Sequence, residues 1–240
     1  MKRMKGQVVV LTGAGRGLGR ALARLFHEQG ACLALGARST HEIDELAAEL
    51  GQDAIALQTD VRSMVDCERL VDAAMAEFGQ LDVMVNNAGV AIYGPLSGMG
   101  QAEVDLMVDT NVKGTMFGTL AAYRVMKERR SGLILNISSI AGKLHLPNEA
   151  IYGASKWAVN GFSGALRLEA MAHRVRVTTV CPGGINTPFW REQEFLPFPE
   201  HLDPAEDFLD PEALARLIVE LSLAPPEMVV PEVTILPMLR

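Results

Sequence analysis

The chain has 240 residues, of which 49% are hydrophobic and 21% are charged, an ordinary composition for a globular protein, and we expect residues 1–240 to form one domain. The net charge of −7 argues against nucleic acid as a partner, because phosphate backbones are bound by clustered lysine and arginine. No apolar run approaches a membrane span, and the three cysteines and five histidines are too scattered for a metal site, so we expect a cytoplasmic protein without a metal.

The first predicted strand, Gln7 to Leu11 (QVVVL), leads into a glycine-rich turn. Its run of valines is typical of a strand that is buried on both faces. The turn, Thr12 to Gly19 (TGAGRGLG), is followed by a helical pattern that ends at Gly30. This order places backbone N–H groups and a positive helix end against a pyrophosphate. An ordinary strand–helix turn is the alternative, but the position at the first such junction favours a dinucleotide site.

The second predicted strand, Cys32 to Gly36, ends in Ala37-Arg38-Ser39. An acidic residue near this point binds the ribose 2′-hydroxyl of NAD, whereas an arginine accommodates the 2′-phosphate of NADP. Arg38 here and Arg16 in the glycine turn, with no carboxylate in this stretch, favour NADP over NAD. The alternative is that both arginines are solvated surface residues.

The alternation of helices and strands then continues with a helix at 41–50, a strand at 53–58, a helix at 63–78 that Ser63 caps, and a strand at 81–85. Asp60 follows the third strand and is compatible with a simple turn or cap. Asn86 and Asn87 follow the fourth strand, where polar side chains contact a ligand in open α/β sheets. Asn86 fits a residue that braces the sheet, and Asn87 fits a ligand contact better.

A loop at 90–100 precedes a long predicted helix at 101–129, which carries Asn111 near its middle. Asparagine and glycine inside a helix lower its propensity, so we expect this region to be kinked or functionally placed. The next strand, 133–138, brings Ser138 and Ser139 to the carboxyl edge of the sheet.

Tyr152 and Lys156 are four residues apart at the start of a predicted helix, and Ser139 precedes Tyr152 by thirteen positions. Residues four apart lie on one face of a helix, so an ammonium lies beside a phenol. The lysine charge is expected to lower the pKa of the phenol from its usual value of about 10. This pattern predicts a site that moves a proton to or from an alcohol or carbonyl oxygen.

The remaining chain predicts a strand at 175–181, a turn at 182–187, an irregular segment at 188–210, a helix at 211–223 and a strand at 228–236. Prolines and aromatic residues at 188–210 favour a substrate lid, and loop packing or a subunit contact is about as compatible with them. The overall βαβα order predicts a doubly wound, mostly parallel sheet.

Together, TGAGRGLG, NNAG (residues 86–89), Asn111, Ser139 with YGASK (152–156) and PGGINT (182–187) closely resemble the motifs of the short-chain dehydrogenases/reductases in their single-domain form. The resemblance covers essentially the whole chain. It implies a Rossmann-type sheet of seven parallel strands in the order 3-2-1-4-5-6-7, a nicotinamide dinucleotide cofactor, and a carbonyl or secondary alcohol as substrate. It also implies a homodimer or homotetramer.

The resemblance also implies roles for residues. Tyr152 would be the general acid, Lys156 would bind the nicotinamide ribose and lower the pKa of Tyr152, Ser139 would bind the substrate oxygen, and Asn111 would hold a relay water. The family spacing selects Ser139 over Ser138. The implied cofactor contacts are Gly13, Arg16, Gly17, Leu18, Arg38, Ser39, Asp60, Val61, Asn87, Gly89, Gly183, Ile185 and Thr187, together with Tyr152 and Lys156.

The expected substrate pocket is partly apolar, with Val90, Ala91, Tyr93, Lys143, Leu144, His145, Ile185, Phe189 and Trp190 as candidates. Two alternatives to an NADP-dependent oxidoreductase stay open. One is an NAD-preferring dehydrogenase of the same family, and the other is a non-catalytic scaffold that senses a nucleotide.

Overall fold

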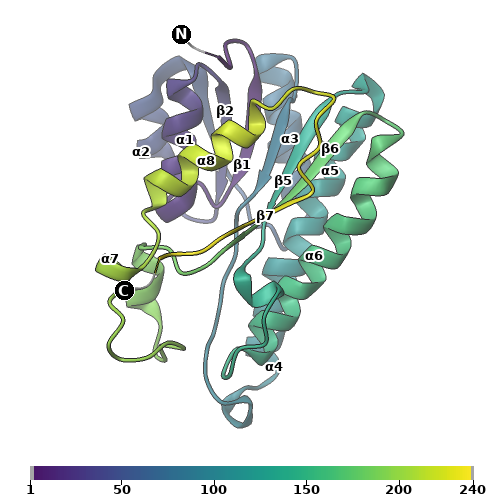
Figure 1. Cartoon of the computed structure of the whole chain (residues 1–240). Coiled ribbons are helices and arrows are strands. Elements are labelled where there is room, and N and C mark those ends of the chain that lie inside the picture. The colour runs from purple at the N-terminus through teal and green to yellow at the C-terminus, as the bar shows by residue number, and fades with distance from the viewer. Residues whose placement is uncertain (1–2, 239–240) are drawn as a thin grey trace.

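The computed structural model describes residues 3–238 and shows a central sheet of seven parallel strands in the order β3-β2-β1-β4-β5-β6-β7 (Figure 1). The strands are β1 (Val8–Thr12), β2 (Cys32–Ala37), β3 (Ala54–Gln58), β4 (Val83–Asn86), β5 (Gly132–Ile137), β6 (Val175–Pro182) and β7 (Glu232–Ile235). The predicted strand order is therefore confirmed.

Helices cover both faces of this sheet. They are α1 (Gly17–Glu28), α2 (Thr40–Leu50), α3 (Met64–Phe78), α4 (Gln101–Met107), α5 (Gly114–Arg129), α6 (Ala150–Met171), α7 (Pro204–Asp207) and α8 (Pro211–Ser222). Within residues 3–238 none of them is both long and apolar enough to cross a bilayer.

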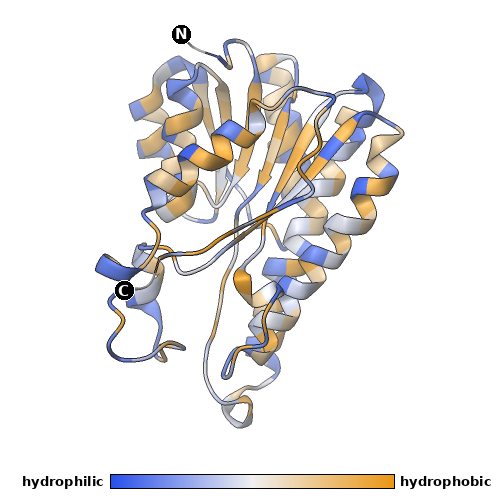
Figure 2. Ribbon diagram, in the orientation of Figure 1, coloured by the Kyte–Doolittle hydropathy of each residue, from blue (hydrophilic) through white to orange (hydrophobic). Residues whose placement is uncertain are grey.

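Two apolar cores lie on the two faces of the sheet, as the alternation of side chains along a strand requires. In β1, Val9 and Leu11 pack against α1, α2 and α8, whereas Val8 and Val10 pack against α3, α5 and α6. Because every residue of β1 is buried, the strand is apolar throughout rather than alternating. Figure 2 shows the hydrophobic strands enclosed between helices whose outer faces are more polar.

Asn86 at the end of β4 is a buried brace, as its position in the sequence suggested. Its amide nitrogen donates to Thr119 Oγ1 in α5 at 2.9 Å and to Asn136 Oδ1 in β5 at 2.8 Å. These two bonds hold the neighbouring strand ends and the helix behind them in one register.

Two predicted elements differ from the structure. The last strand was expected at 228–236, but β7 begins only at Glu232, because Pro231 has no N–H to donate to the ladder. The carbonyls of Val230 and Pro231 instead accept from Thr178 Oγ1 and the Thr179 N–H.

The helix expected at 101–129 is divided into α4 and α5 by a π-helical turn at Val108–Lys113. This is the interruption that the asparagine and glycine of the segment indicated. Elsewhere the predicted elements agree with the structure to within about two residues, and the Ser63 cap is present because its hydroxyl accepts from the Asp66 N–H.

Two segments project beyond the carboxyl ends of the strands (Figure 1). One follows β4 and runs from residue 90 to residue 100. The other, at 188–210, contains a 3-10 turn at Pro188–Glu192 and the single-turn helix α7. Both segments enclose the end of the sheet at which the predicted functional residues lie.

Candidate active site

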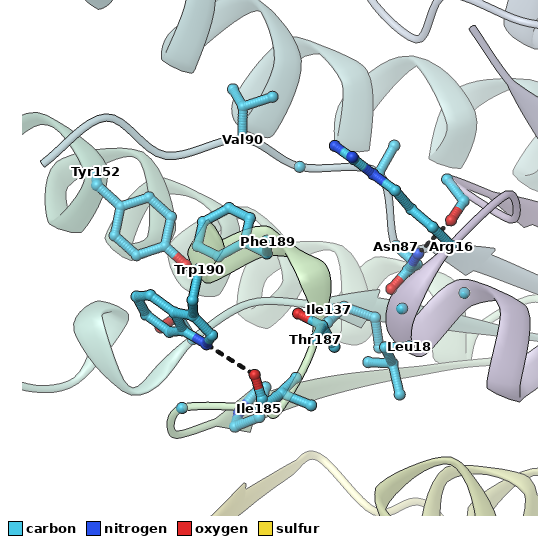
Figure 3. A pocket seen from close by; sticks show the side chains of 18 of the residues that line it. Arg16, Leu18, Asn87, Val90, Ile137, Tyr152, Ile185, Thr187, Phe189 and Trp190 are labelled. Atoms are coloured by element: carbon cyan, nitrogen blue, oxygen red, sulfur yellow. Dashed lines mark hydrogen bonds between the residues drawn. The ribbon is translucent and has the colours of Figure 1, made fainter. Parts of the chain in front are cut away.

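A cavity of about 760 Å³ lies at the carboxyl ends of the strands, within the range of small-molecule sites (Figure 3). It brings together residues from the ends of β1, β2, β4, β5 and β6. Predicted residues on its lining are Gly13, Arg16, Gly17, Leu18, Arg38, Ser39, Asp60, Val61, Asn87, Gly89, Ser139, Tyr152, Lys156, Gly183, Ile185 and Thr187.

The glycine-rich turn is pressed against the end of β4. Gly13 has a φ of 65°, and a Cβ added there would lie 2.9 Å from the Cα of Ala88. The Asn87 amide holds the turn by donating to the carbonyls of Thr12 at 3.1 Å and Gly13 at 3.0 Å. The backbone at Gly13, Gly15 and Gly17 and the first turn of α1 therefore line the cavity, and this cradle fits the phosphates of a dinucleotide.

Arg16 does not extend freely toward the cavity. Its guanidinium forms a two-pronged ion pair with the Glu192 carboxylate, with 2.8 Å between Nη2 and Oε2. The pair joins the glycine turn to the 3-10 turn of segment 188–210. Both side chains are about half exposed, so the pair is weak and sensitive to salt. A phosphate at this position competes with Glu192 for Arg16.

Arg38 is exposed and lines the cavity beside the end of β2, in line with the expected phosphate contact. The cavity also has an acidic lining residue close to the glycine turn. Glu42, in the first turn of α2, also lines the cavity, and its Oε2 would lie only 2.5 Å from a Cβ on Gly15. Because this carboxylate lies on the lining, the absence of an acid at residues 37–39 supports NADP less strongly than the sequence indicated.

Asp60 serves both as a turn residue and as part of the lining. Its carboxylate accepts from the Arg62 backbone N–H and guanidinium, and these bonds lower the pKa of Asp60. Its own backbone N–H donates to Asp66 Oδ2 at 3.0 Å. Asp60 thus acts as the predicted turn residue and also lies on the cavity lining, where a cofactor contact was expected.

The Tyr152 hydroxyl, on the first turn of α6, lies near the hydroxyls of Ser139 and Tyr93, and hydrogen bonding with both lowers its pKa. Burial has the larger and opposite effect and raises the pKa of Tyr152 to about 12. The protein groups alone thus do not lower the phenol pKa below its usual value, contrary to the expectation from Lys156.

Lys156 explains this difference. Its ammonium lies 5.7 Å from the centre of the Tyr152 ring and donates to the Ile137 carbonyl at 3.2 Å. It therefore faces the ring rather than the hydroxyl. Burial also lowers the pKa of Lys156 to about 8, so that near neutral pH the amine is close to losing its charge.

Ser138 and Ser139 both line the cavity but have different partners. Ser139, at the start of a 3-10 turn, accepts from the Ala141 N–H at 3.1 Å and lies close enough to Tyr152 to lower the pKa of the phenol. Ser138 donates to the Lys156 carbonyl at 3.2 Å and so connects the end of β5 to α6. The contact with Tyr152 agrees with the choice of Ser139 over Ser138.

Asn111 lies behind the cavity rather than on its lining. Its amide nitrogen donates to the Val90 carbonyl and to Ser155 Oγ, and its Oδ1 accepts from the Val90 N–H. A Cβ added to Gly89 would lie 3.4 Å from Asn111 Oδ1 and 3.6 Å from Lys156 Nζ. The residue is thus next to the lysine, but its side chain holds the loop after β4.

The other end of the cavity has an aromatic wall, which we define as Tyr93, Phe189, Trp190, Phe198 and Phe208. Tyr93 and Trp190 stack with centroids 5.9 Å apart, and Trp190 meets Phe198 and Phe208 edge to face. The Trp190 indole is fixed by a 2.8 Å bond from its N–H to the Ile185 carbonyl (Figure 3). Segment 188–210 therefore forms part of the cavity wall.

Four of the expected pocket residues, Ala91, Lys143, Leu144 and His145, are absent from the cavity lining. Lys143 pairs with Glu232 at 2.7 Å, and the His145 ring stacks on Trp157 outside the cavity. The expected pocket was wrong at these four positions, and Lys143 and His145 are directed to partners outside the cavity.

Glu149 is a lining residue that sequence reasoning missed. It precedes α6, three positions before Tyr152, and only 8% of it is exposed. Its carboxylate is close enough to raise the pKa of both Tyr93 and Tyr152. The spacing to Tyr152 was the available signal, since residues three apart share a helix face.

The comparisons with known proteins agree on one family. A sequence model described as short chain dehydrogenase matches residues 7–195. An uncharacterised oxidoreductase of Staphylococcus saprophyticus is 32% identical over 91% of this chain and 90% of its own.

Two solved structures cover nearly all of the chain. An alcohol dehydrogenase of the archaeon Thermococcus sibiricus, complexed with 5-hydroxy-NADP, has a TM-score of 0.85 and 28% identity over 95% of both chains. A 3-ketoacyl-(acyl-carrier-protein) reductase of Brucella melitensis, complexed with NADH, has a TM-score of 0.88 and 28% identity over 97% of this chain and 98% of its own.

Proposed function

Since this chain belongs to the short-chain dehydrogenase family, we propose that it is an NADP(H)-dependent oxidoreductase that interconverts a carbonyl compound and a secondary alcohol, with Tyr152 as general acid and base. The observation that carries the proposal is the hydroxyl cluster of Tyr152, Ser139 and Tyr93 in the same cavity as the glycine turn. Bound nicotinamide supplies the hydride, and the protein supplies orientation and the proton.

In this proposal the glycine turn and the start of α1 bind the pyrophosphate, for which the backbone cradle at Gly13 is the support. Asp60 and Val61 flank the adenine. Gly89, Ile185 and Thr187 line the nicotinamide half, and Lys156, buried below Tyr152, binds the ribose hydroxyls.

The proton leaves Tyr152 for the substrate oxygen in reduction and returns to it in oxidation. Ser139 orients that oxygen and stabilises the charge that develops on it. Because burial raises the pKa of Tyr152 to about 12, the phenol is a proton donor at neutral pH, which favours reduction there. Asn111 is proposed to hold a water that links Lys156 to solvent.

The NADP preference rests on Arg38, with Arg16 available if Glu192 releases it. Glu42 opposes this preference, because a carboxylate beside the adenosine ribose repels a 2′-phosphate. The family neighbours include one complexed with 5-hydroxy-NADP and one complexed with NADH, so either cofactor is compatible with the fold. We propose NADP because Arg38, at the end of β2, can bind the 2′-phosphate.

We also propose a cytoplasmic homodimer or homotetramer. Apolar side chains on the outer faces of α5 and α6, among them Leu120, Trp157 and Leu168, are largely exposed and support a contact with another copy. Light scattering after size exclusion would measure the assembly.

The proposed function is tested by Tyr152→Phe, with Tyr123→Phe as the matched control. Tyr123 packs against His173 outside the cavity. With NADPH and a panel of ketones, 3-oxo esters, hydroxy acids and sugars, we expect Tyr152→Phe to lose about 10³-fold or more in kcat while still enhancing NADPH fluorescence. A Tyr152→Phe rate near that of the wild type refutes the assignment. NADPH binding by the wild type without any turnover supports the nucleotide-sensing scaffold instead.

A further inference from the structure

Glu149 is a buried carboxyl group that faces the cavity without a protein partner. Within residues 3–238 no hydrogen bond or ion pair reaches its side chain, and its backbone carbonyl alone is used, by the Gly153 N–H at 2.6 Å. With 8% of the residue exposed, more than nine-tenths of it is buried, and what remains opens into the cavity.

A carboxylate in this position is costly, because most of the residue is buried and its oxygens reach solvent only through the cavity, so that the charge is incompletely hydrated. The effect is visible in its acidity, since burial raises the pKa of Glu149 to about 7. A cation that enters the cavity provides the missing partner and restores the charged form.

The surroundings of Glu149 suit a particular kind of cation. The aromatic wall lies in the same cavity, and Tyr93, whose ring contacts both Tyr152 and Trp190, is close enough to Glu149 for the carboxylate to raise its pKa. Aromatic faces attract alkylammonium groups, which the carboxylate binds by charge and by hydrogen bonds.

The distribution of charge along the cavity argues against an anionic substrate. Its remaining charged lining residues within 3–238 are Lys156 and four residues of the glycine turn, the end of β2, the start of α2 and the loop after β3, namely Arg16, Arg38, Glu42 and Asp60. Lys156 is directed to the Ile137 carbonyl beneath Tyr152. The substrate end therefore has one carboxylate and no arginine, so it lacks a partner for an anionic substrate.

We propose that Glu149 and the aromatic wall bind the ammonium group of the substrate, so that the enzyme acts on amino alcohols and the corresponding amino ketones that carry no carboxylate. This inference rests on the proposed function, because it places the amine beside the hydroxyl that Tyr152 serves. The position of Glu149 three residues before Tyr152 at the start of α6 brings the two groups to one side of the helix.

Turnover of matched alcohols tests the substrate class. At pH 8, where the amine is protonated, 1-amino-2-propanol is compared with 2-butanol, and 4-amino-2-butanol with 2-pentanol, since each pair differs by an ammonium in place of a methyl group. The anion 3-hydroxybutanoate serves as a further test substrate, because it carries a carboxylate instead of an ammonium. With NADP⁺ we expect kcat/KM to favour the amine at least tenfold in one pair and to be lowest for the anion.

Glu149→Gln should reduce that amine-to-neutral ratio to near one, because it removes the charge and keeps the shape. Glu169→Gln, an exposed carboxylate on the same helix, should leave the ratio unchanged. A wild-type ratio near or below one, or a ratio that survives in Glu149→Gln, overturns the ammonium site.

A binding measurement separates this inference from the proposed function. n-Butylamine should raise the Tm of the wild type, with and without NADP⁺, more than 1-butanol does, and Glu149→Gln should abolish the difference. If n-butylamine has this effect but no alcohol or ketone is turned over, the proposed reaction is contradicted and the ammonium site is supported. If neutral alcohols are turned over but n-butylamine has no effect on the Tm, the ammonium site is contradicted and the proposed reaction is supported.

Discussion

The Tyr93 ring meets the Tyr152 ring edge to face, with centroids 5.4 Å apart and an interplanar angle of 72°, and the Tyr93 hydroxyl lies close enough to that of Tyr152 to lower the pKa of Tyr152. Tyr93 comes from the loop after β4, whereas Tyr152 comes from α6. Burial holds the pKa of Tyr93 well above its usual value, so Tyr93 stays protonated and acts as a donor. It is therefore a positioning residue for the phenol proposed as acid and base.

Tyr93→Phe should lower kcat about three- to tenfold, the effect of one hydrogen bond of about 1 kcal/mol. Because that interaction lowers the pKa of Tyr152, its loss should also move to higher pH the ascending limb of the pH–rate profile for alcohol oxidation, where the rate rises as Tyr152 ionises. Tyr123→Phe should leave the profile in place. A purely structural role of Tyr93 predicts a lower Tm without the shift in the profile, and this outcome would contradict the positioning role.

Arg38→Asp should shift the cofactor preference toward NADH, because it replaces the cation at the end of β2 with a carboxylate that repels a 2′-phosphate and binds a ribose hydroxyl. We expect the NADPH-to-NADH ratio of kcat/KM to fall at least tenfold. The same exchange at Arg216, exposed on α8, should not change the ratio. An unchanged ratio in Arg38→Asp removes the basis for NADP preference.

Glu192→Gln should strengthen NADPH binding about threefold at low salt, since it frees Arg16 and removes a negative charge from the cavity mouth. The gain should shrink at 0.5 M salt, where exposed charges are screened. Fluorescence titration of NADPH measures both effects. Glu194→Gln, an exposed carboxylate in the same segment, is the control. Weaker binding in Glu192→Gln would instead identify the ion pair as a clasp that holds the cofactor.

Glu149 should make the stability of the protein depend on pH. Its pKa in the folded protein is about 7, above its ordinary value of 4.5, so between these values the folded state holds a proton that the unfolded chain releases. Stability is therefore lost as the pH rises from 4.5 to 7 and then stays level with respect to this group. The shift corresponds to about 3 kcal/mol.

Urea unfolding at pH 4.5 and pH 7.5 measures this contribution. The free energy of unfolding of Glu149→Gln minus that of the wild type should increase by about 3 kcal/mol between the two pH values. Tyr93 and Tyr152 titrate well above this range and Lys156 at about 8, so they interfere little. A constant difference would show that Glu149 has the same pKa in the folded and unfolded states.

The local motifs allowed the strand order and the lining of the cofactor end to be predicted, because each motif occupies the carboxyl end of a strand and parallel strands bring those ends together. Glu42 was missed because its approach to Gly15 depends on how α2 packs. The Arg16–Glu192 pair was missed because the two residues are 176 positions apart, and nothing near either residue indicates the other.

The pKa of Tyr152 was mispredicted for a related reason. Helical spacing places Lys156 beside Tyr152 but does not state whether the ammonium meets the ring or the hydroxyl. It also carries no information on burial, which outweighs the hydrogen bonds from Ser139 and Tyr93. Glu149 shows the same limit, since only the folded chain reveals a carboxylate without a partner.

The π-helical turn at Val108–Lys113 makes the site sensitive to insertions and deletions in that segment. This turn directs Asn111 inward to hold Val90. A π-helical turn contains one residue more than the α-helical turn that it replaces. One residue is about 100° of rotation in a helix, so deleting one here would turn α4 against α5 by that angle and carry Asn111 away from Val90. Insertions and deletions are thus expected to be tolerated at residues 95–100, on the loop tip. At 108–113 they are expected to disrupt the site.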